Sequence, residues 1–148
     1  MFTVKQLVQT KENDTIFSVA PADTVFRALQ VMADKNVGAV LVLQDGELAG
    51  IFTERDYCRK IILMGRSSLN TQVQEIMTRK MITVSPEQTI EECMELMSQH
   101  HIRHLPVLDQ GRLVGILSIG DVVKAIITAK QDTIENLEDY IMGRYIKR

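Results

Sequence analysis

Two stretches of the chain have apolar residues at the spacing of an amphipathic helix. One stretch follows Thr24 and the other follows Thr89, and each has apolar residues at positions i, i+3, i+4 and i+7. These residues are Val25, Ala28, Leu29 and Met32 in the first stretch and Ile90, Cys93, Met94 and Met97 in the second. The pattern predicts two helices that bury the same face, with their methionines in the core.

Each predicted helix is followed by two apolar runs that predict a pair of strands. The runs span Ala39–Leu43, Leu48–Phe52, His104–Leu108 and Leu113–Leu117. Asp45-Gly46 separates the first two runs and Gln110-Gly111 the last two, and glycine adopts the positive φ that a tight turn requires. We therefore expect two β-hairpins.

Shorter elements complete each half of the chain. Short helices are predicted at Thr3–Val8 and Val73–Met77, and short strands that end at a proline at Ile16–Val19 and Met81–Val84. A last helix begins at Thr53 or Ser118, and its apolar positions are Tyr57, Ile61 and Ile62, or Val122, Val123 and Ile126. The predicted order in each half is strand, helix, strand, strand, helix.

The two halves are one unit used twice. A shift of 65 positions lays Val37–Asp56 over Ile102–Asp121 without a gap. A unit of this size would be marginally stable alone, so we expect the two to pack face to face as one pseudo-symmetric α/β (α+β) module. The expected boundaries are 1–68 for the first unit with its N-terminal helix, 69–130 for the second, and 131–148 for a C-terminal helix. That helix either covers the module or contacts a second copy.

Composition narrows the class of partner. A chain of 148 residues with 45% hydrophobic residues can fill a core, and a net charge of −2 gives no broad attraction to nucleic acid or anionic lipid. Apolar runs such as Val37–Leu43 are too short to cross a bilayer, and no signal pattern begins the sequence. Cys58 and Cys93 lack metal-ligand spacing and suit reduced thiols. We expect a cytoplasmic protein without membrane or nucleic-acid partners.

Two sequence blocks resemble those of a tandem CBS-domain pair, also called a Bateman module. The blocks are DGELAGIFTERD and DQGRLVGILSIGD, and they are accompanied by Leu105-Pro106-Val107 and by helices that begin Thr-Val and Thr-Ile. The resemblance covers nearly the whole chain. It implies a regulatory module, not a catalyst, that binds AMP, ADP, ATP, NAD or S-adenosylmethionine in clefts between the two units.

A hydroxyl residue and an aspartate three places later open the last helix of each unit. These pairs are Thr53 with Asp56 and Ser118 with Asp121. The resemblance implies that the aspartates accept hydrogen bonds from ribose hydroxyls, and that the threonine and serine hold the sugar or phosphate. A carboxylate suits a diol, and a helix start favours phosphate. The alternative is a capping box that satisfies the helix start alone.

Cationic side chains are candidates for phosphate contacts. Arg103 and His104 precede the Leu-Pro-Val segment, where the resemblance implies phosphate-binding groups, whereas the first unit has Gly38 and Ala39 there. We therefore expect the second unit's cleft to be the better anion site, with contributions across the interface from Arg55, Arg59 or Lys60. A solvated helix face is the alternative for Arg59 and Lys60.

The resemblance implies that adenine is held by backbone groups and apolar side chains around the first strand and the start of the second. The matching residues are Thr83, Val84 and Ile102 in the second unit and Ser18, Val19 and Val37 in the first.

Other chemistry finds little support in the sequence. His100, His101 and His104 are not joined by a carboxylate or cysteine at ligand spacing, so we predict no metal site. The chain has no nucleophile beside a general base, no P-loop and no G-x-G-x-x-G, so we predict no enzyme. The leading hypothesis is a homodimeric adenosine-nucleotide sensor that regulates a partner protein. The alternative is a ligand-free CBS pair that serves dimerisation or docking.

Overall fold

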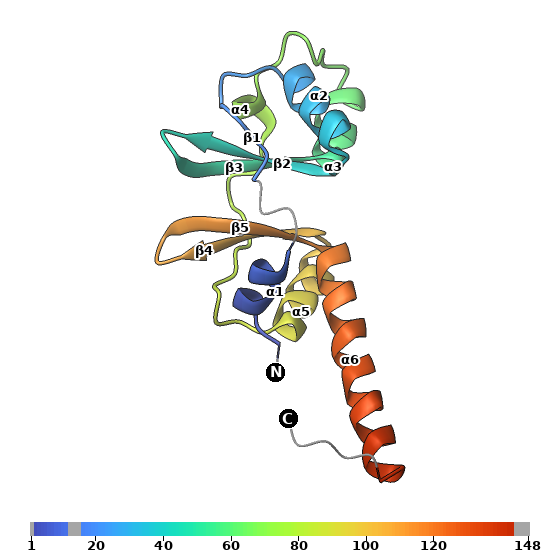
Figure 1. The fold of residues 1–148 in the computed structure, drawn as a ribbon. Helices are drawn as coiled ribbons and strands as arrows, with labels where there is room; N and C mark the ends of the chain where they lie inside the picture. The colour runs from blue at the N-terminus through green and yellow to red at the C-terminus, as the bar shows by residue number, and fades with distance from the viewer. Residues whose placement is uncertain (1, 12–15, 144–148) are drawn as a thin grey trace.

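Two small sheets lie face to face at the centre of the molecule (Figure 1). The computed structural model describes residues 2–11 and 16–143. The first sheet has the order β1 (Ser18–Val19), β2 (Ala39–Gln44), β3 (Glu47–Thr53), and the second pairs β4 (His104–Asp109) with β5 (Arg112–Ser118). Leu41 and Ile51 of the first sheet pack with Leu113 and Ile116 of the second. The two units therefore share apolar surface, as predicted.

Both hairpins form at the expected turns. Asp45 and Gly46 have φ values of 52° and 80°, and Gln110 and Gly111 have 50° and 79°. Two successive residues with positive φ make the kind of turn whose twist matches that of antiparallel strands. The register in both hairpins shifts at the same place, after Val42 in the first and after Val107 in the second.

The two long predicted helices form and begin at the expected threonines. They are α2 (Val25–Lys35) and α5 (Ile90–His100), and the hydroxyls of Thr24 and Thr89 accept backbone N–H groups at 3.0 and 3.2 Å. Met32 and Met97 are buried in separate apolar clusters, one on the outer face of each sheet. The repeat is therefore visible in the fold as well as in the sequence.

The short helices cross from one unit to the other. Helix α1 (Val4–Thr10) packs into the cluster formed by α5 and the second hairpin, and α4 (Val73–Ile76) packs into the cluster of the first unit (Figure 1). In the sequence α1 precedes the first unit, whereas in the structure its apolar face is buried in the core of the second. Each helix carries an apolar face that either core could bury, so the sequence pattern does not select the partner.

Three predicted elements differ in the structure. The last helix of the first unit is a short α3 (Glu54–Asp56) followed by a π-helical segment, η1 (Tyr57–Ile62). Its i→i+5 hydrogen bonds change the helical phase, so Ile61 is buried whereas Ile62 is 55% exposed. The predicted strand Met81–Val84 contributes one bridge, from Val84 to β4. The two helices predicted at the C-terminus form a single helix, α6 (Ile119–Ile141), so the expected break is wrong.

Candidate functional site

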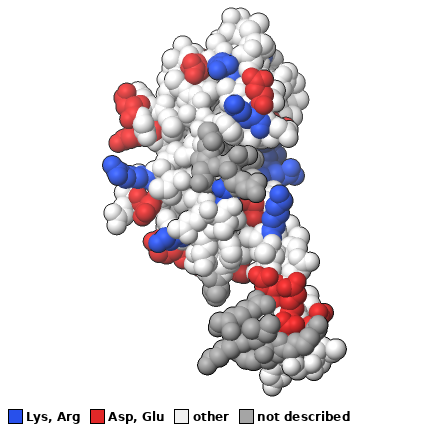
Figure 2. All heavy atoms as spheres, in the orientation of Figure 1, with Lys and Arg blue, Asp and Glu red and all other residues white. Residues whose placement is uncertain are grey.

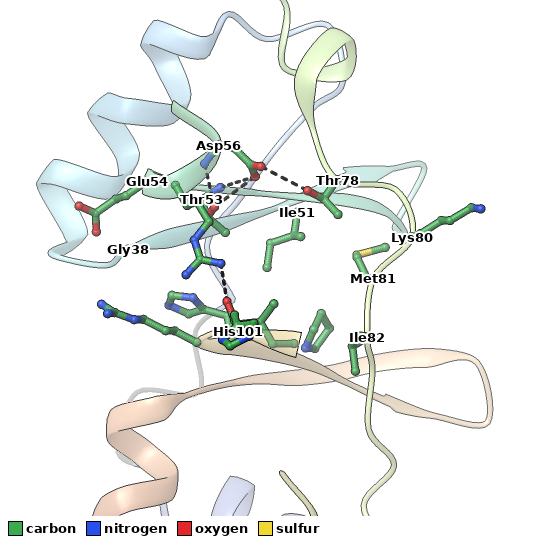
Figure 3. Close-up of a pocket in the computed structure, with 15 residues that line it drawn as sticks. Gly38, Ile51, Thr53, Glu54, Asp56, Thr78, Lys80, Met81, Ile82 and His101 are labelled. Atoms are coloured by element: carbon green, nitrogen blue, oxygen red, sulfur yellow. Dashed lines mark hydrogen bonds between the residues drawn. The ribbon is translucent and has the colours of Figure 1, made fainter. Parts of the chain in front are cut away.

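A cavity of about 510 Å³ lies at the junction of the two units (Figure 3). One wall is formed by the end of β3 and by α3, which provide Ile51 and the segment from Thr53 to Asp56. The opposite wall is the segment from His101 to His104, and the connection from Thr78 to Ile82 closes one side. Both units therefore contribute to one site.

Asp56 is buried at the start of α3, where it forms the predicted capping box with Thr53. The Thr53 backbone N–H donates to Asp56 Oδ2 at 3.0 Å, and the Asp56 N–H donates to the Thr53 hydroxyl oxygen at 3.1 Å. The sequence interval of three positions permits this exchange because N-cap and N3 face one another across the first helical turn. The capping interpretation is therefore correct for this pair, and both residues also line the cavity.

The Asp56 carboxylate has further partners. Lys60 Nζ lies 3.0 Å from Oδ1, the Thr78 hydroxyl donates to the same oxygen at 3.3 Å, and the Thr53 hydroxyl lies 3.2 Å from Oδ2. With the Thr53 N–H, these contacts use the four acceptor positions of a carboxylate. A bound sugar hydroxyl would have to replace one of these four contacts. The Thr78 contact is the longest, so we expect it to be displaced first.

Cationic groups from both units surround the cavity. Arg55 reaches across the junction and donates to the backbone carbonyl of His101, which has φ 54° at the end of α5. Lys80, Arg103 and His104 also line the cavity. The structure thus brings Arg103 and His104 together with Asp56 and Arg55. Arg59 is exposed on η1 and is not among the lining residues, and Lys60 acts through its contact with Asp56.

His104 is half-buried at the start of β4. Burial lowers the pKa of its imidazole below the ordinary 6.5, Asp121 acts in the opposite direction, and Lys11 and Arg103 lower the pKa further. Burial therefore favours the neutral form of the imidazole. An anion bound beside it would favour the protonated form and raise this pKa.

Apolar side chains form the remaining surface of the cavity: Ile51, Met81, Ile82, Ile102 and Pro106. Among the residues expected near adenine, Ile102 lies here. Thr83 and Val84 do not line the cavity, because the part of this segment that does so ends at Ile82. The Val84 backbone instead pairs with β4 through both its N–H and its carbonyl. The first-unit residues lie elsewhere: Ser18 is exposed, Val19 is buried in the core, and Val37 packs against that core.

Asp121 has a different environment from Asp56, although it forms the same capping box. The Ser118 N–H donates to its Oδ2 at 2.9 Å, and Lys11 Nζ lies 2.9 Å from the same oxygen. Lys11 also donates to the carbonyl of Ile116 at 2.8 Å. Burial would raise the pKa of the Asp121 carboxyl, but the Ser118 N–H and Lys11 outweigh it and hold the pKa below the usual 3.8. The N-terminal segment therefore occupies one oxygen of this aspartate.

Sequence reasoning missed Lys80, which lines the cavity, and two residues that contact the aspartates. Thr78 reaches Asp56 because its backbone pairs with Ile51 of β3, and Lys11 reaches Asp121 across most of the chain. Neither residue belongs to a motif, and the 65-residue shift does not align either with a similar residue. Pairing between distant segments could have been found only from the fold.

Neither a metal-binding cluster nor a membrane-spanning helix is found among the described residues. Within residues 2–11 and 16–143, no group of three or more histidine, cysteine, aspartate or glutamate side chains is arranged to hold a metal ion. Over the same residues, no helix has both the length and the apolar character needed to span a bilayer.

Comparisons with known proteins identify the family. The family model for the CBS domain matches residues 4–63 and 73–128. The chain is 48% identical over 128 residues to the CBS domain-containing protein CBSX3, mitochondrial, of Arabidopsis thaliana. The aligned region covers 83% of this chain and 62% of that relative. This chain therefore spans less than two thirds of that relative's length.

Solved structures agree with this result. A protein with CBS domains from Burkholderia ambifaria MC40-6 is 50% identical, with a TM-score of 0.82 over 85% of this chain and 94% of that one. The structure of CBSX2 in complex with AMP is 26% identical, with a TM-score of 0.73 over 88% of this chain and 99% of that one. The chain therefore belongs to the CBS-domain family and carries two CBS domains.

Proposed function

We propose that this chain is a regulatory module that binds an adenine nucleotide in the cavity between its two CBS domains. The observation that carries the proposal is the composition of that cavity. It combines a buried carboxylate, Asp56, with the cations Arg55, Lys80 and Arg103 and with an apolar wall. A nucleotide has the matching groups: a sugar diol, an anionic phosphate and an apolar base.

The size of the cavity supports this proposal. Ligand sites usually enclose roughly 300–1,000 Å³, and this cavity has about 510 Å³. CBSX2, which has the same fold, is a protein whose structure contains AMP. For this chain we keep AMP, ADP, ATP, NAD and S-adenosylmethionine as candidates, because all of them carry an adenosine half.

The proposed mechanism is linkage between the two domains. Asp56 and Arg55 come from the first domain, whereas Arg103 and His104 come from the second. A ligand that contacts both groups binds best in one relative arrangement of the domains and shifts the population towards it. A partner protein would then read that arrangement. This role requires no catalysis, and we expect none.

The test is the melting temperature of the chain with each candidate nucleotide. A ligand at about one hundred times its dissociation constant adds roughly 2.7 kcal/mol to the free energy of unfolding. Asp56→Asn keeps an oxygen that can accept the Thr53 N–H. Asp121→Asn is the matched control, since Asp121 has the same cap and does not line the cavity.

We expect one nucleotide to raise the melting temperature of the native chain and of Asp121→Asn, and to have a much smaller effect on Asp56→Asn. Arg103→Gln should weaken binding from the other domain. An equal loss in both aspartate variants would place the ligand elsewhere. If no nucleotide stabilises the native chain, the proposal is wrong, and the ligand-free interaction domain becomes the better hypothesis.

That second hypothesis is favoured by the exposed apolar side chains of α6. We keep the cytoplasm as the expected location and a second copy as an expected partner.

A further inference from the structure

Helix α6 is longer than the CBS domain requires. It runs from Ile119 to Ile141, whereas the match to the family ends at residue 128. Its first turns pack on the second domain through Val122 and Ala125, which are buried. Its later turns extend past the rest of the molecule (Figure 1). The core therefore accounts for the first half of this helix and not for the second.

An exposed stripe runs along α6 beside its buried face. We call it the α6 stripe: Val123, Ile127, Lys130, Ile134, Leu137 and Ile141. The five apolar members are 40%, 54%, 54%, 56% and 77% exposed, in chain order. Successive members are separated by alternating intervals of four and three residues, which is the spacing of the seam between two paired helices. Apolar groups aligned in this way usually mark a contact surface.

The charges on α6 indicate what covers this stripe. Lys124 and Lys130 lie in the first half together with Asp121, which is paired with Lys11, whereas Asp132, Glu135, Glu138 and Asp139 lie in the second. Figure 2 shows acidic side chains gathered along the later turns of the helix. A helix with one basic half and one acidic half is complementary to a second copy of itself that runs in the opposite direction.

Residue register supports the antiparallel arrangement. If Ile127 faces Leu137 of a second copy, then Val123 faces Ile141 and Ile134 faces Lys130 of that copy. Lys124 then lies beside Glu138 of the second copy on the flank of the seam, and symmetry forms this pair twice. A parallel pair would instead place Lys130 against Lys130 in the seam.

We propose that the α6 stripe binds the α6 stripe of a second copy, and that the two helices run antiparallel. The seam from Val123 to Ile141 is about 28 Å long at 1.5 Å per residue. This inference concerns assembly and is independent of nucleotide binding. It specifies the surface and direction of contact, which the expected homodimer alone does not.

The first experiment measures the mass of the full chain by analytical ultracentrifugation over a concentration series. Ile134→Asp places a charge in the seam, and Asn136→Asp places the same charge on another face of the same turn. We expect a dimer for the native chain and for Asn136→Asp, and dimerisation weakened roughly tenfold or more for Ile134→Asp. Melting of Ile134→Asp is compared with that of the native chain at a concentration at which both are monomers, and equal melting there excludes a folding defect.

The second experiment tests direction by exchanging charges. Lys124→Glu and Glu138→Lys each create like charges across an antiparallel seam, so each variant alone should dimerise more weakly than the native chain. Mixed together, the two variants should form a heterodimer, because each then offers the charge that the other needs. Absence of heterodimer preference would overturn the antiparallel register. A native chain that stays monomeric, or a dimer that Ile134→Asp leaves intact, would overturn the proposal.

Discussion

Gly50 and Gly115 occupy the same position in the two repeats, and we predict opposite responses to alanine. Each lies in the second strand of its hairpin and pairs with the valine that precedes the register shift, Val42 for Gly50 and Val107 for Gly115. A Cβ added at Gly50 would lie 2.7 Å from Met77 Sδ, 2.9 Å from Met77 Cγ and 3.0 Å from the carbonyl oxygen of Thr78. Cβ atoms do not tolerate contacts this close, so neighbouring atoms must move.

The neighbours of Gly50 have little freedom to move. Met77 is 7% exposed, so its side chain has no solvent space to enter. The Thr78 carbonyl accepts the Ile51 N–H at 3.0 Å, and the Thr78 N–H donates to the Ile51 carbonyl at 2.9 Å. Withdrawing Thr78 would weaken this bridge and also shift its hydroxyl, which contacts Asp56. Overpacking of this kind costs about 1–3 kcal/mol.

The control gives the opposite expectation. Among the described residues near Gly115, the added Cβ would meet only the two Val8 methyl carbons, both at 3.6 Å, which is ordinary contact. Gly115→Ala should therefore change the free energy of unfolding by less than about 1 kcal/mol, and in the stabilising direction if unfolded-state entropy dominates.

The assay is thermal and urea unfolding of both variants. At roughly 3 °C per kcal/mol for a chain of this size, Gly50→Ala should lower the melting temperature by about 3–9 °C. Equal melting of the two variants would refute the reasoning, because the geometric difference between the repeats would then have no energetic consequence.

Three further predictions concern titratable groups. Because the folded-state pKa of His104 is lowered, the unfolded chain takes up the proton first, so stability should fall as the pH drops below about 6.5. His104→Gln should reduce that slope in melting curves. Burial raises the pKa of Cys93 to about 11, whereas Cys58 is exposed, so iodoacetamide should label Cys58 alone in the native chain, and labelling of both would contradict the fold. Lys11→Met should destabilise the chain by roughly 0.2–1 kcal/mol, since its ion pair with Asp121 is partly exposed. The Asp121 pKa is lowered, so this difference should be complete above about pH 4 and should disappear as the pH falls through the folded-state value.

Elements with local causes were predictable from the sequence. Gly46 and Gly111 mark turns that depend on two adjacent residues, and Thr24 and Thr89 cap helices through contacts within one turn. The aspartates of the two capping boxes were found for the same reason. Contacts within one turn define each of these features, so the sequence pattern identifies them without knowledge of distant segments.

Features that depend on distant contacts were not predictable. The apolar faces of α1 and α4 do not specify which core buries them. The π-helical turn moves Ile62 to the surface although its spacing is that of a core residue. Apolar periodicity identifies a buried face only if the helical phase is regular and the partner is known.

The two aspartates illustrate how tertiary contacts divide one motif into two chemical environments. Asp56 and Asp121 share the same cap and position, so the repeat predicts the same ligand chemistry for both. Residues outside the repeated motifs separate them: Thr78 and the following segment line a cavity beside Asp56, whereas Lys11 forms an ion pair with Asp121. Both carboxylates already contact an ammonium group, Lys60 Nζ at 3.0 Å from Asp56 and Lys11 Nζ at 2.9 Å from Asp121, so the ion pair does not by itself distinguish the two positions. Selectivity between the two positions should thus depend on the cavity that the segment from Thr78 onwards forms beside Asp56, and not on the shared motif.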